Sequence, residues 1–385
     1  MEKFILEPEI YYGKNAINYL SELNGKKACI VTDKFMVDLG FIEKITKILD
    51  ETGITYKVFS EVEADPSRET VLRGLNHIIE QKPDILIAMG GGSPIDAAKA
   101  IMYFCIKTKE KLVEPELIKK PWFVAIPTTS GTGSEVTSYA VITDKEKNIK
   151  IPLTENIMLP DVAILDYELT KTMPPSVTAD TGMDVLTHAI EAYVSKYASD
   201  YTDIYAKKAI EIVFDYLNKA YEDGSDLEAR GKMHNASCMA GIAFCNSSLG
   251  INHSLAHALG GTFHLPHGRC NALFLPYVVR FNAGLKGLQI ENLEVAKKYQ
   301  KIARTIGLPA DTPLEGVLSI SEGIKIMNQR FNIPTTIKEF GIEKNKYFKH
   351  IEDMAKSAVN DICTSGNPTK TELQDFINLY KEAYE

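Results

Sequence analysis

Histidine and aspartate residues with helical spacing are the first feature of this sequence that could do chemistry. Four of the eight histidines lie between residues 253 and 267. His253 and His257 are four residues apart, and so are Asp184 and His188, so each pair would share one face of a helix. Each pair could then place two donor atoms on one ion. Imidazole and carboxylate donors together suit Fe(II), Zn(II) or a similar divalent cation and leave coordination free for a substrate.

The alternative for any single pair is a histidine held by a hydrogen bond inside a protein core. The spacing alone also does not separate His253 from His257 as a ligand. A zinc protease is not predicted, because Ser254 follows His253 where the H-E-x-x-H motif has its glutamate. The isolated His234 and His350 are expected to be structural or to lie on the surface.

A glycine turn, Gly90-Gly91-Gly92-Ser93-Pro94, follows the apolar run at 85–89 and precedes a helical pattern. Three glycines allow the backbone to approach a ligand closely, Ser93 could cap the helix, and Pro94 fits its first position. The free N–H groups at a helix start suit a pyrophosphate. An ordinary glycine turn between a strand and a helix is the alternative.

Two further segments favour a dinucleotide. Asp33 directly follows a buried strand, where a carboxylate could accept a hydrogen bond from a ribose 2′-OH and would repel a 2′-phosphate. The segment at 127–134 follows another strand and could form a second polar loop that faces an anion. Asp33 precedes the glycines, and no G-x-G-x-x-G is present, so the order differs from the Rossmann fingerprint. The three segments together predict a dinucleotide, and Asp33 predicts NAD(H) over NADP(H).

Short β-branched runs alternate with helical patterns over the first 175 residues. The expected strands, several of them apolar throughout as in a parallel sheet buried on both faces, are 27–32, 56–59, 85–89, 123–126 and 162–165. Residues 68–81 have helical spacing, and beyond Pro174-Pro175 the patterns are almost wholly helical. The sequence therefore predicts an α/β domain at 1–175 with a parallel, dinucleotide-binding sheet. An all-helical, metal-binding catalytic domain is predicted at 176–385.

Composition narrows the class of protein. The 385 residues carry a net charge of −8, with 45% hydrophobic and 24% charged residues, which is typical of a globular protein and argues against a nucleic-acid or anionic-membrane partner. The most apolar stretch, 85–106, contains the glycines, Asp96 and Lys99, so it cannot be a membrane span. The six cysteines are widely spaced and indicate reduced thiols. We therefore expect a cytoplasmic protein.

The motifs occur in the order found in one known family. GGGSPIDAAK at 90–99, PTTSGTGSEVT at 127–137, D-x-x-x-H at Asp184 and His188, and H-x-x-x-H followed by PHG at 266–268 resemble the iron-dependent (group III) alcohol dehydrogenases. The likeness is greatest to the short-chain alcohol and propanol dehydrogenases of that family, and it covers essentially the whole chain. It implies a dehydroquinate synthase-like fold, with an N-terminal nucleotide-binding domain, a helical metal-binding domain and an active site in the cleft between them.

The resemblance also implies roles for individual residues. Four ligands would hold the metal, Fe(II) or else Zn(II), and they are Asp184, His188, His253 and His267. His257 matches an extra histidine near the nicotinamide and is the candidate catalytic proton relay. The positions along NAD(H) are Asp33, Gly91, Gly92, Ser93, Asp96, Thr128, Thr129 and Lys150. The positions that line the substrate pocket are Tyr139, Phe244 and Cys363.

The implied reaction is hydride transfer between NAD(H) and a small primary aliphatic alcohol or aldehyde, with the metal as Lewis acid. Ethanol, propanol, butanol and 1,3-propanediol all remain candidates. The family's usual G-N-P-R is Gly366-Asn367-Pro368-Thr369 here, so its pocket specificity does not transfer directly. A small-molecule substrate and a homodimer or larger homo-oligomer are expected, either free in the cytoplasm or in a bacterial microcompartment.

Two other enzyme classes are alternatives. An NAD- and metal-dependent lyase of the dehydroquinate synthase type would need a basic pocket, and no cluster of arginine and lysine lies beside the histidines in the sequence. A metallohydrolase would use a similar metal site, but it would not need the glycine loop, the hydroxyl-rich loop or Asp33.

Overall fold

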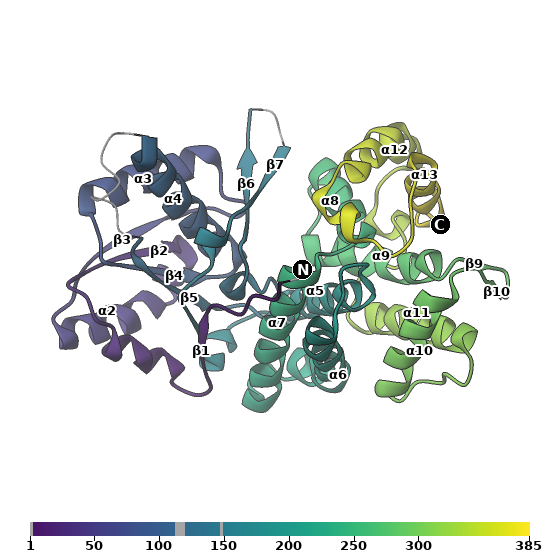
Figure 1. Cartoon of the computed structure of the whole chain (residues 1–385), viewed down its shortest axis with the longest axis horizontal. Coiled ribbons are helices and arrows are strands. Elements are labelled where there is room, and N and C mark those ends of the chain that lie inside the picture. The colour runs from purple at the N-terminus through teal and green to yellow at the C-terminus, as the bar shows by residue number, and fades with distance from the viewer. Residues whose placement is uncertain (1–2, 112–119, 147–148) are drawn as a thin grey trace. The chain divides into compact units, whose positions relative to one another are not determined.

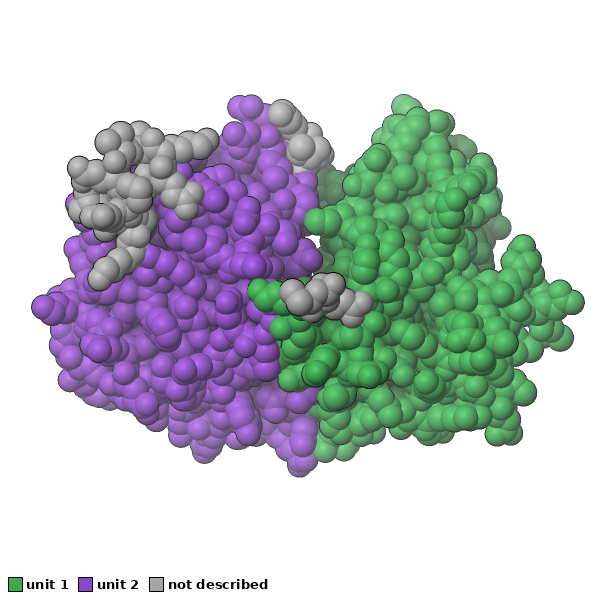
Figure 2. Space-filling model, viewed as in Figure 1, with its two compact units in different colours: residues 1–4, 174–224, 242–385 green, residues 5–173, 225–241 purple. Residues whose placement is uncertain are grey.

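The structure, a computed structural model, describes residues 3–111, 120–146 and 149–385. The chain divides into two compact units (Figure 2). Unit 1 comprises Met1–Phe4, Pro174–Gly224 and Ile242–Glu385, and unit 2 comprises Ile5–Met173 and Ser225–Gly241.

Unit 2 is built around a six-stranded parallel sheet (Figure 1). In spatial order its strands are β1 (Glu9–Tyr12), β8 (Val162–Leu165), β5 (Trp122–Pro127), β4 (Ile85–Gly90), β2 (Lys27–Asp33) and β3 (Thr55–Val62). The five predicted strands are confirmed, with bounds that differ by a few residues at most. β1 is not predicted from the sequence, because it is short and only half-buried along one edge.

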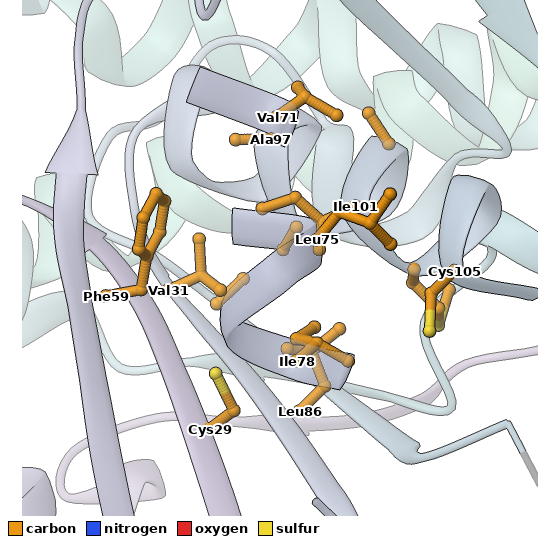
Figure 3. Close-up of a cluster of buried hydrophobic side chains, with 14 of the residues drawn as sticks. Cys29, Val31, Phe59, Val71, Leu75, Ile78, Leu86, Ala97, Ile101 and Cys105 are labelled. Atoms are coloured by element: carbon orange, nitrogen blue, oxygen red, sulfur yellow. The ribbon is translucent and has the colours of Figure 1, made fainter. Parts of the chain in front are cut away.

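Side chains alternate between the two faces of this sheet. On β4, Leu86 and Ala88 belong to a buried cluster shared with α3 (Arg68–Gln81) and α4 (Gly92–Lys111). Figure 3 shows Leu86 of this cluster with Ile78 of α3 and Ile101 of α4. Ile87 faces the opposite cluster, which is shared with α2 (Phe41–Thr52). Helices therefore cover both faces, which explains why β4 is apolar throughout and confirms the predicted α/β fold.

Local signals place the remaining elements of unit 2. α3 has the predicted bounds, and Ser67 caps it by accepting a hydrogen bond from the Thr70 N–H at 3.2 Å. The 3-10 helix η1 spans Ala16–Glu22, and α1 spans Lys34–Asp38. A separate antiparallel hairpin of β6 (Tyr139–Asp144) and β7 (Ile149–Thr154) is not predicted from the sequence.

Unit 1 is mostly helical, as predicted. Its helices are α5 (Pro175–Val194), α6 (Asp200–Glu222), α8 (Ile251–Phe263), α9 (His267–Asn282), α10 (Leu293–Thr305), α11 (Pro313–Arg330), α12 (Lys344–Val359) and α13 (Leu373–Glu382), with the 3-10 helix η7 at Ile362–Gly366. The two-residue strands β9 (Leu285–Lys286) and β10 (Gln289–Ile290) form its small hairpin. One large buried cluster joins α8, α9, α12 and α13. Among the described residues, no helix is long and apolar enough to cross a membrane.

Helix α7 (Leu227–Ser247) belongs to both units, because residues up to Gly241 fall in unit 2 and residues from Ile242 fall in unit 1. The two units are therefore not identical to the predicted domains, 1–175 and 176–385. The segment Ser225–Gly241 is helical in sequence pattern but groups with the α/β unit, and Met1–Phe4 group with the helical unit.

Candidate functional site

Three of the four predicted metal ligands come together from α5 and α8 of unit 1. Asp184 and His188 lie one turn apart on α5, and His253 lies on α8. Their donor atoms all lie within 4.8 Å of one another, and all three side chains are buried. The rings of His188 and His253 are stacked with their centroids 4.5 Å apart. The helical spacing thus does what the sequence predicts and puts Asp184 and His188 on one side of α5.

The fourth predicted ligand, His267, is the first residue of α9. Its Nε2 lies 3.5 Å from Asp184 Oδ1, and its ring centroid lies 5.4 Å from that of His253. The His267 side chain is 38% exposed, whereas that of Asp184 is 5% exposed, so the cluster is accessible from the side of His267. Three imidazoles and one carboxylate that converge in this way fit a divalent cation such as Fe(II) or Zn(II).

A close approach between α5 and α9 positions His267. A Cβ at Gly268 would lie 2.1 Å from the backbone oxygen of Asp180, so any side chain there would force the two helices apart. The neighbouring Arg269 donates its Nε–H to Asp180 Oδ1 at 2.8 Å. These two contacts bring the start of α9 against α5, one turn before Asp184.

Glu191 holds the opposite side of the His253 ring. Its Oε2 forms a short hydrogen bond with His253 Nδ1, and its Oε1 accepts the Asn252 N–H at 2.7 Å. Burial raises the pKa of Glu191 to about 8, against the lowering effect of the backbone N–H groups around it. The pairing leaves Nε2 as the nitrogen that faces Asp184. Glu191 is not among the predicted site residues, although its position one turn after His188 on the same face of α5 is a signal that could identify it.

His257 lies beside this cluster but is bonded elsewhere. Its ring centroid is 5.2 Å from that of His267 and 5.9 Å from that of His253. Its Nδ1 pairs with Asp361 Oδ2 at 2.9 Å, and the other oxygen of Asp361 accepts the Cys363 N–H at 2.8 Å. Burial acts to raise the pKa of Asp361, but hydrogen bonding and charge from His257 outweigh it and lower the pKa. The structure thus gives His257 a partner that sequence reasoning missed.

The three predicted pocket residues fall in different parts of the fold. Phe244 on α7 stacks on His188 with centroids 4.6 Å apart, and Cys363 on η7 is buried. Burial raises the pKa of the Cys363 thiol, so it stays protonated. Both belong to unit 1, whereas Tyr139 begins β6 in unit 2.

In unit 2, the two predicted cofactor loops lie against each other at the carboxyl ends of β4 and β5. The Thr128 N–H donates to Gly90 O at 2.9 Å. A Cβ at Gly91 would lie 3.4 Å from the Thr129 side chain, and a Cβ at Gly92 would lie 2.8 Å from that of Thr132. The glycines therefore allow the second loop to pack directly on the first. α4 begins at Gly92, so Ser93 lies within the first turn of the helix. The prediction that Ser93 is the capping residue immediately before the helix is therefore wrong.

Asp33 ends β2 next to this turn. Its Oδ1 caps α1 by accepting the Met36 N–H at 2.9 Å, and its Oδ2 lies 3.3 Å from where a Cβ of Gly90 would be. The chain runs from β2 to β3 on one side and returns to β4 on the other side of β2, so β2 and β4 mark the point where the strand order reverses. Open α/β sheets bind their ligands at this point, beyond the carboxyl ends of the strands.

Ser93 and Lys150 lie close to a common partner, Asp65. The Asp65 N–H donates to Ser93 Oγ at 3.4 Å, and Lys150 Nζ pairs with Asp65 Oδ1 at 2.6 Å. Because Lys150 lies on β7, this ion pair brings the hairpin to the loop that follows β3.

Asp96 is bonded within the protein. Its two oxygens accept the Ser134 hydroxyl at 2.6 Å and the Val141 N–H at 2.9 Å. Lys99 Nζ also bonds Ser134 Oγ, at 2.9 Å. Burial raises the pKa of Asp96, against the lowering effect of Lys99. Asp96 and Lys99 therefore tie α4 to the end of the second loop, and Asp96 also ties it to β6.

His234, which is expected from the sequence to be structural or exposed, is buried on α7. Its Nδ1 lies 3.0 Å from Ser130 Oγ in the second loop. Burial lowers its pKa to about 4, so the imidazole is neutral near pH 7.

Comparisons with known proteins agree with this geometry. The model of the family described as "Iron-containing alcohol dehydrogenase" matches residues 7–167. The model described as "Fe-containing alcohol dehydrogenase family, C-terminal" matches residues 178–384. The chain is 44% identical over 392 residues to a protein of Clostridium saccharobutylicum named NADPH-dependent butanol dehydrogenase, with 100% of this chain and 98% of the relative covered. It is 41% identical over 384 residues to the 1-propanol dehydrogenase PduQ of Citrobacter freundii, with 99% of this chain and 100% of the relative covered.

Other relatives are longer, and solved structures show the same architecture. The chain spans 46% of an aldehyde-alcohol dehydrogenase of Streptococcus pneumoniae, to which it is 42% identical. A crystal structure of 1,3-propanediol oxidoreductase superposes with a TM-score of 0.90 at 33% identity, covering 100% of both chains. An iron-containing alcohol dehydrogenase from Thermococcus thioreducens superposes with a TM-score of 0.87 at 32% identity, covering 99% of both. The chain belongs to the iron-containing alcohol dehydrogenase family.

Proposed function

We propose that this protein interconverts small primary aliphatic alcohols and aldehydes by direct hydride transfer to or from NAD(H), in a metal-dependent reaction. The observation that carries the proposal is the convergence of Asp184, His188, His253 and His267 next to His257. Membership of the iron-containing alcohol dehydrogenases favours this reaction over the lyase and the metallohydrolase.

The four side chains would hold Fe(II), or Zn(II), which as a Lewis acid would polarise the substrate oxygen and stabilise an alkoxide. Glu191 would keep the Nε2 of His253 directed toward Asp184. Phe244, stacked on His188, would cover the cluster with an apolar ring and exclude water.

His257 would exchange the proton of the substrate hydroxyl with solvent. Its side chain is 31% exposed, so it has access to water. Its Nδ1 is held by Asp361, which leaves Nε2 to exchange a proton with the substrate, directly or through one water.

NAD(H) would bind at the switch between β2 and β4. The N-terminus of α4 and the second loop would bind the pyrophosphate. The Asp33 carboxylate would accept hydrogen bonds from the hydroxyls of the adenosine ribose. The relative from Clostridium saccharobutylicum is named as NADPH-dependent, but Asp33 places a carboxylate at the end of β2, where it would repel a 2′-phosphate.

The substrate would be short and uncharged. Phe244 is apolar and stacks on His188, the buried Cys363 thiol is protonated, and Tyr139 would add a second aromatic ring. The relatives named for butanol, 1-propanol and 1,3-propanediol act on alcohols of this size. A homodimer or larger assembly in the cytoplasm, or inside a microcompartment, belongs to the same proposal.

The test follows the loss of NADH absorbance with propanal under anaerobic conditions. Protein stripped of metal should be inactive, and Fe(II) or Zn(II) should restore turnover. His253→Ala should not be restored by either metal, whereas His350→Ala, a histidine outside the cluster, should behave as the unchanged protein. The proposal is wrong if neither metal supports turnover of propanal, butanal or 3-hydroxypropanal although metal and NADH are both bound.

A further inference from the structure

The donor atoms of three proposed ligands surround one side-chain amide, that of Asn271. Its Nδ2 lies 2.7 Å from Asp184 Oδ1, 3.1 Å from His253 Nε2 and 3.0 Å from His267 Nε2. Asn271 lies on α9, one turn after His267, and is fully buried. Neither the spacing of the histidines nor the family motifs assign it a role.

The orientation of this amide follows from its other contacts. Asn252 Nδ2 donates to Asn271 Oδ1 and to Asn271 O, both at 3.1 Å. If the Asn271 amide were turned over, two NH₂ groups would face each other on one side, and two oxygens would face each other across the contact with Asp184. The amide therefore turns Nδ2 toward Asp184 and the two histidines, and at the shortest of these contacts, 2.7 Å, it donates an N–H to Asp184 Oδ1.

Asn252 is itself anchored. It precedes His253 on α8, and its backbone N–H donates to Glu191 Oε1 at 2.7 Å. Glu191 Oε2 bonds His253 Nδ1. A continuous set of hydrogen bonds therefore runs from His253 through Glu191, Asn252 and Asn271 to Asp184, and it joins α5, α8 and α9.

We propose that Asn271 is a positioning residue of the metal centre. Its amide donates to Asp184 Oδ1 and holds the carboxylate in the orientation in which it meets the histidine Nε2 atoms, and Asn252 keeps the amide from turning. This inference rests on the proposed function, because it takes Asp184, His253 and His267 as the metal ligands. Outer hydrogen-bond partners of this kind typically change metal affinity by about 10- to 100-fold when removed.

The experiment measures metal binding without turnover. Metal-stripped protein is titrated with Zn(II) against a chromophoric chelator, and with Co(II), whose visible absorption spectrum reports the ligand geometry. Asn271→Leu keeps the volume of the side chain and removes the donor, so its Zn(II) affinity should fall about 10- to 100-fold and its Co(II) spectrum should change. Turnover measured at saturating metal should fall much less than the affinity.

The matched control is Asn328→Leu. Asn328 is also buried, and its Nδ2 donates to Ala272 O, next to Asn271 on α9, at 2.7 Å, but it contacts none of the proposed ligands. This substitution should lower the melting temperature while the Zn(II) affinity and the Co(II) spectrum stay as in the unchanged protein. If both substitutions weaken binding equally, the effect comes from loss of stability and the inference is wrong.

A second variant, Asn252→Ala, covers the case in which Asn271→Leu does not fold. By itself Asn252→Ala should weaken Zn(II) binding by a smaller factor, and unchanged Zn(II) binding would contradict the proposed path. Where Asn271→Leu does fold, Asn252→Ala should add little in that background, because both act through the same amide. An equal effect of Asn252→Ala in both backgrounds contradicts the proposed path. If the unchanged protein binds no metal, the proposed function fails; if it binds one ion and Asn271→Leu binds it as tightly, only the inference about Asn271 fails.

Discussion

At the scale of single residues, Asp33 combines a structural role with the proposed contact to the ribose. Oδ1 caps α1, and Oδ2 faces the Gly90 turn. Substitutions can therefore separate the helix cap from the negative charge of the carboxylate. Asp33→Asn retains an oxygen for the cap but removes the charge, and Asp33→Gly removes both at little cost to the helix. Both variants should raise kcat/KM for NADPH relative to NADH about tenfold or more, equivalent to about 1.4 kcal/mol. An unchanged cofactor ratio in both would contradict the assignment of Asp33 to the ribose.

His257 offers a second test at this scale. His257→Ala should lower kcat by about 100-fold or more, the usual contribution of a positioned acid–base group, and the metal content measured by atomic absorption should stay at that of the unchanged protein. Asp361→Asn should lower kcat by less, because the imidazole remains and only its charged partner is lost. If metal is lost together with turnover in His257→Ala, His257 is a ligand and not a relay.

The raised pKa of the buried Glu135 carboxyl predicts how the free energy of unfolding depends on pH. Burial raises its pKa from 4.5 in an unfolded chain to about 7 in the folded protein. Between these values the folded protein keeps a proton that the unfolded chain releases, so the contribution of Glu135 to the free energy of unfolding falls as the pH rises and levels off above pH 7. The loss approaches about 3 kcal/mol.

Glu135→Gln removes this titration. The variant should gain stability relative to the unchanged protein between pH 5 and pH 8, as measured by thermal unfolding at both values. Glu80→Gln, an exposed residue on α3, serves as the control and should show the same difference at both pH values. A difference between Glu135→Gln and the unchanged protein that does not grow with pH would contradict the raised pKa.

The residues of the site divide into those that local sequence pattern can predict and those that it cannot. The pairing of Asp184 with His188 and the glycine turn are predictable because helical spacing and turn chemistry act over a few residues, but the cap predicted at Ser93 is wrong because α4 begins at Gly92. The hydrogen bonds His253–Glu191, Asn271–Asp184 and His257–Asp361 join residues 62, 87 and 104 positions apart. No local pattern specifies such pairs, and their partners become known only when α5, α8, α9 and η7 are packed together.

At the scale of elements, the same limit applies to the fold. Strands β4, β5 and β8 of unit 2 are apolar throughout and could be predicted, as could α3, whose cap and apolar face are both local. β1, β6 and β7 could not, because they are short or half-exposed and lack a continuous apolar run. Helix α7 continues without a break across Gly241, so nothing local indicates that the residues before and after this point belong to different units.

The contact between α5 and α9 gives a prediction about elements. Gly268→Ala places a methyl group against Asp180 O and should force the start of α9 away from α5, which destabilises unit 1 by about 1–3 kcal/mol or more. His267 moves with α9, so Zn(II) affinity should fall as well. The control is Gly261→Ala on α8, where a Cβ meets no atom within 4 Å and alanine favours the helix. Unaltered Zn(II) binding in Gly268→Ala would show that this approach does not position His267.

At the scale of the whole molecule, the proposed metal centre and the proposed cofactor loops belong to separate units, and each ligand should stabilise its own. A ligand at about 100 times its Kd adds about 2.7 kcal/mol to the state that binds it. Zn(II) should therefore slow amide hydrogen exchange in α5, α8 and α9, and NADH should slow it in the β4–α4 turn and the segment at 127–134. Asp184→Asn should abolish the first effect and retain the second. Protection of the β4–α4 turn by Zn(II) alone would contradict this division.

Helix α7 also affects the order in which the two units can fold during synthesis. Ser130 pairs with His234, and a Cβ on Gly133 would lie 2.7 Å from Gly241 Cα, so the loop at 127–134 is packed against the part of α7 that ends at Gly241. A ribosome reaches this part of α7 only after it has synthesised Asp184 and His188. While the beginning of unit 1 is being synthesised, the loop at 127–134 therefore lacks its contacts with Ser130's partner His234 and with Gly241. A gene truncated after residue 175 should for this reason yield a sheet without a finished nucleotide loop, even though the cut falls where the sequence pattern changes.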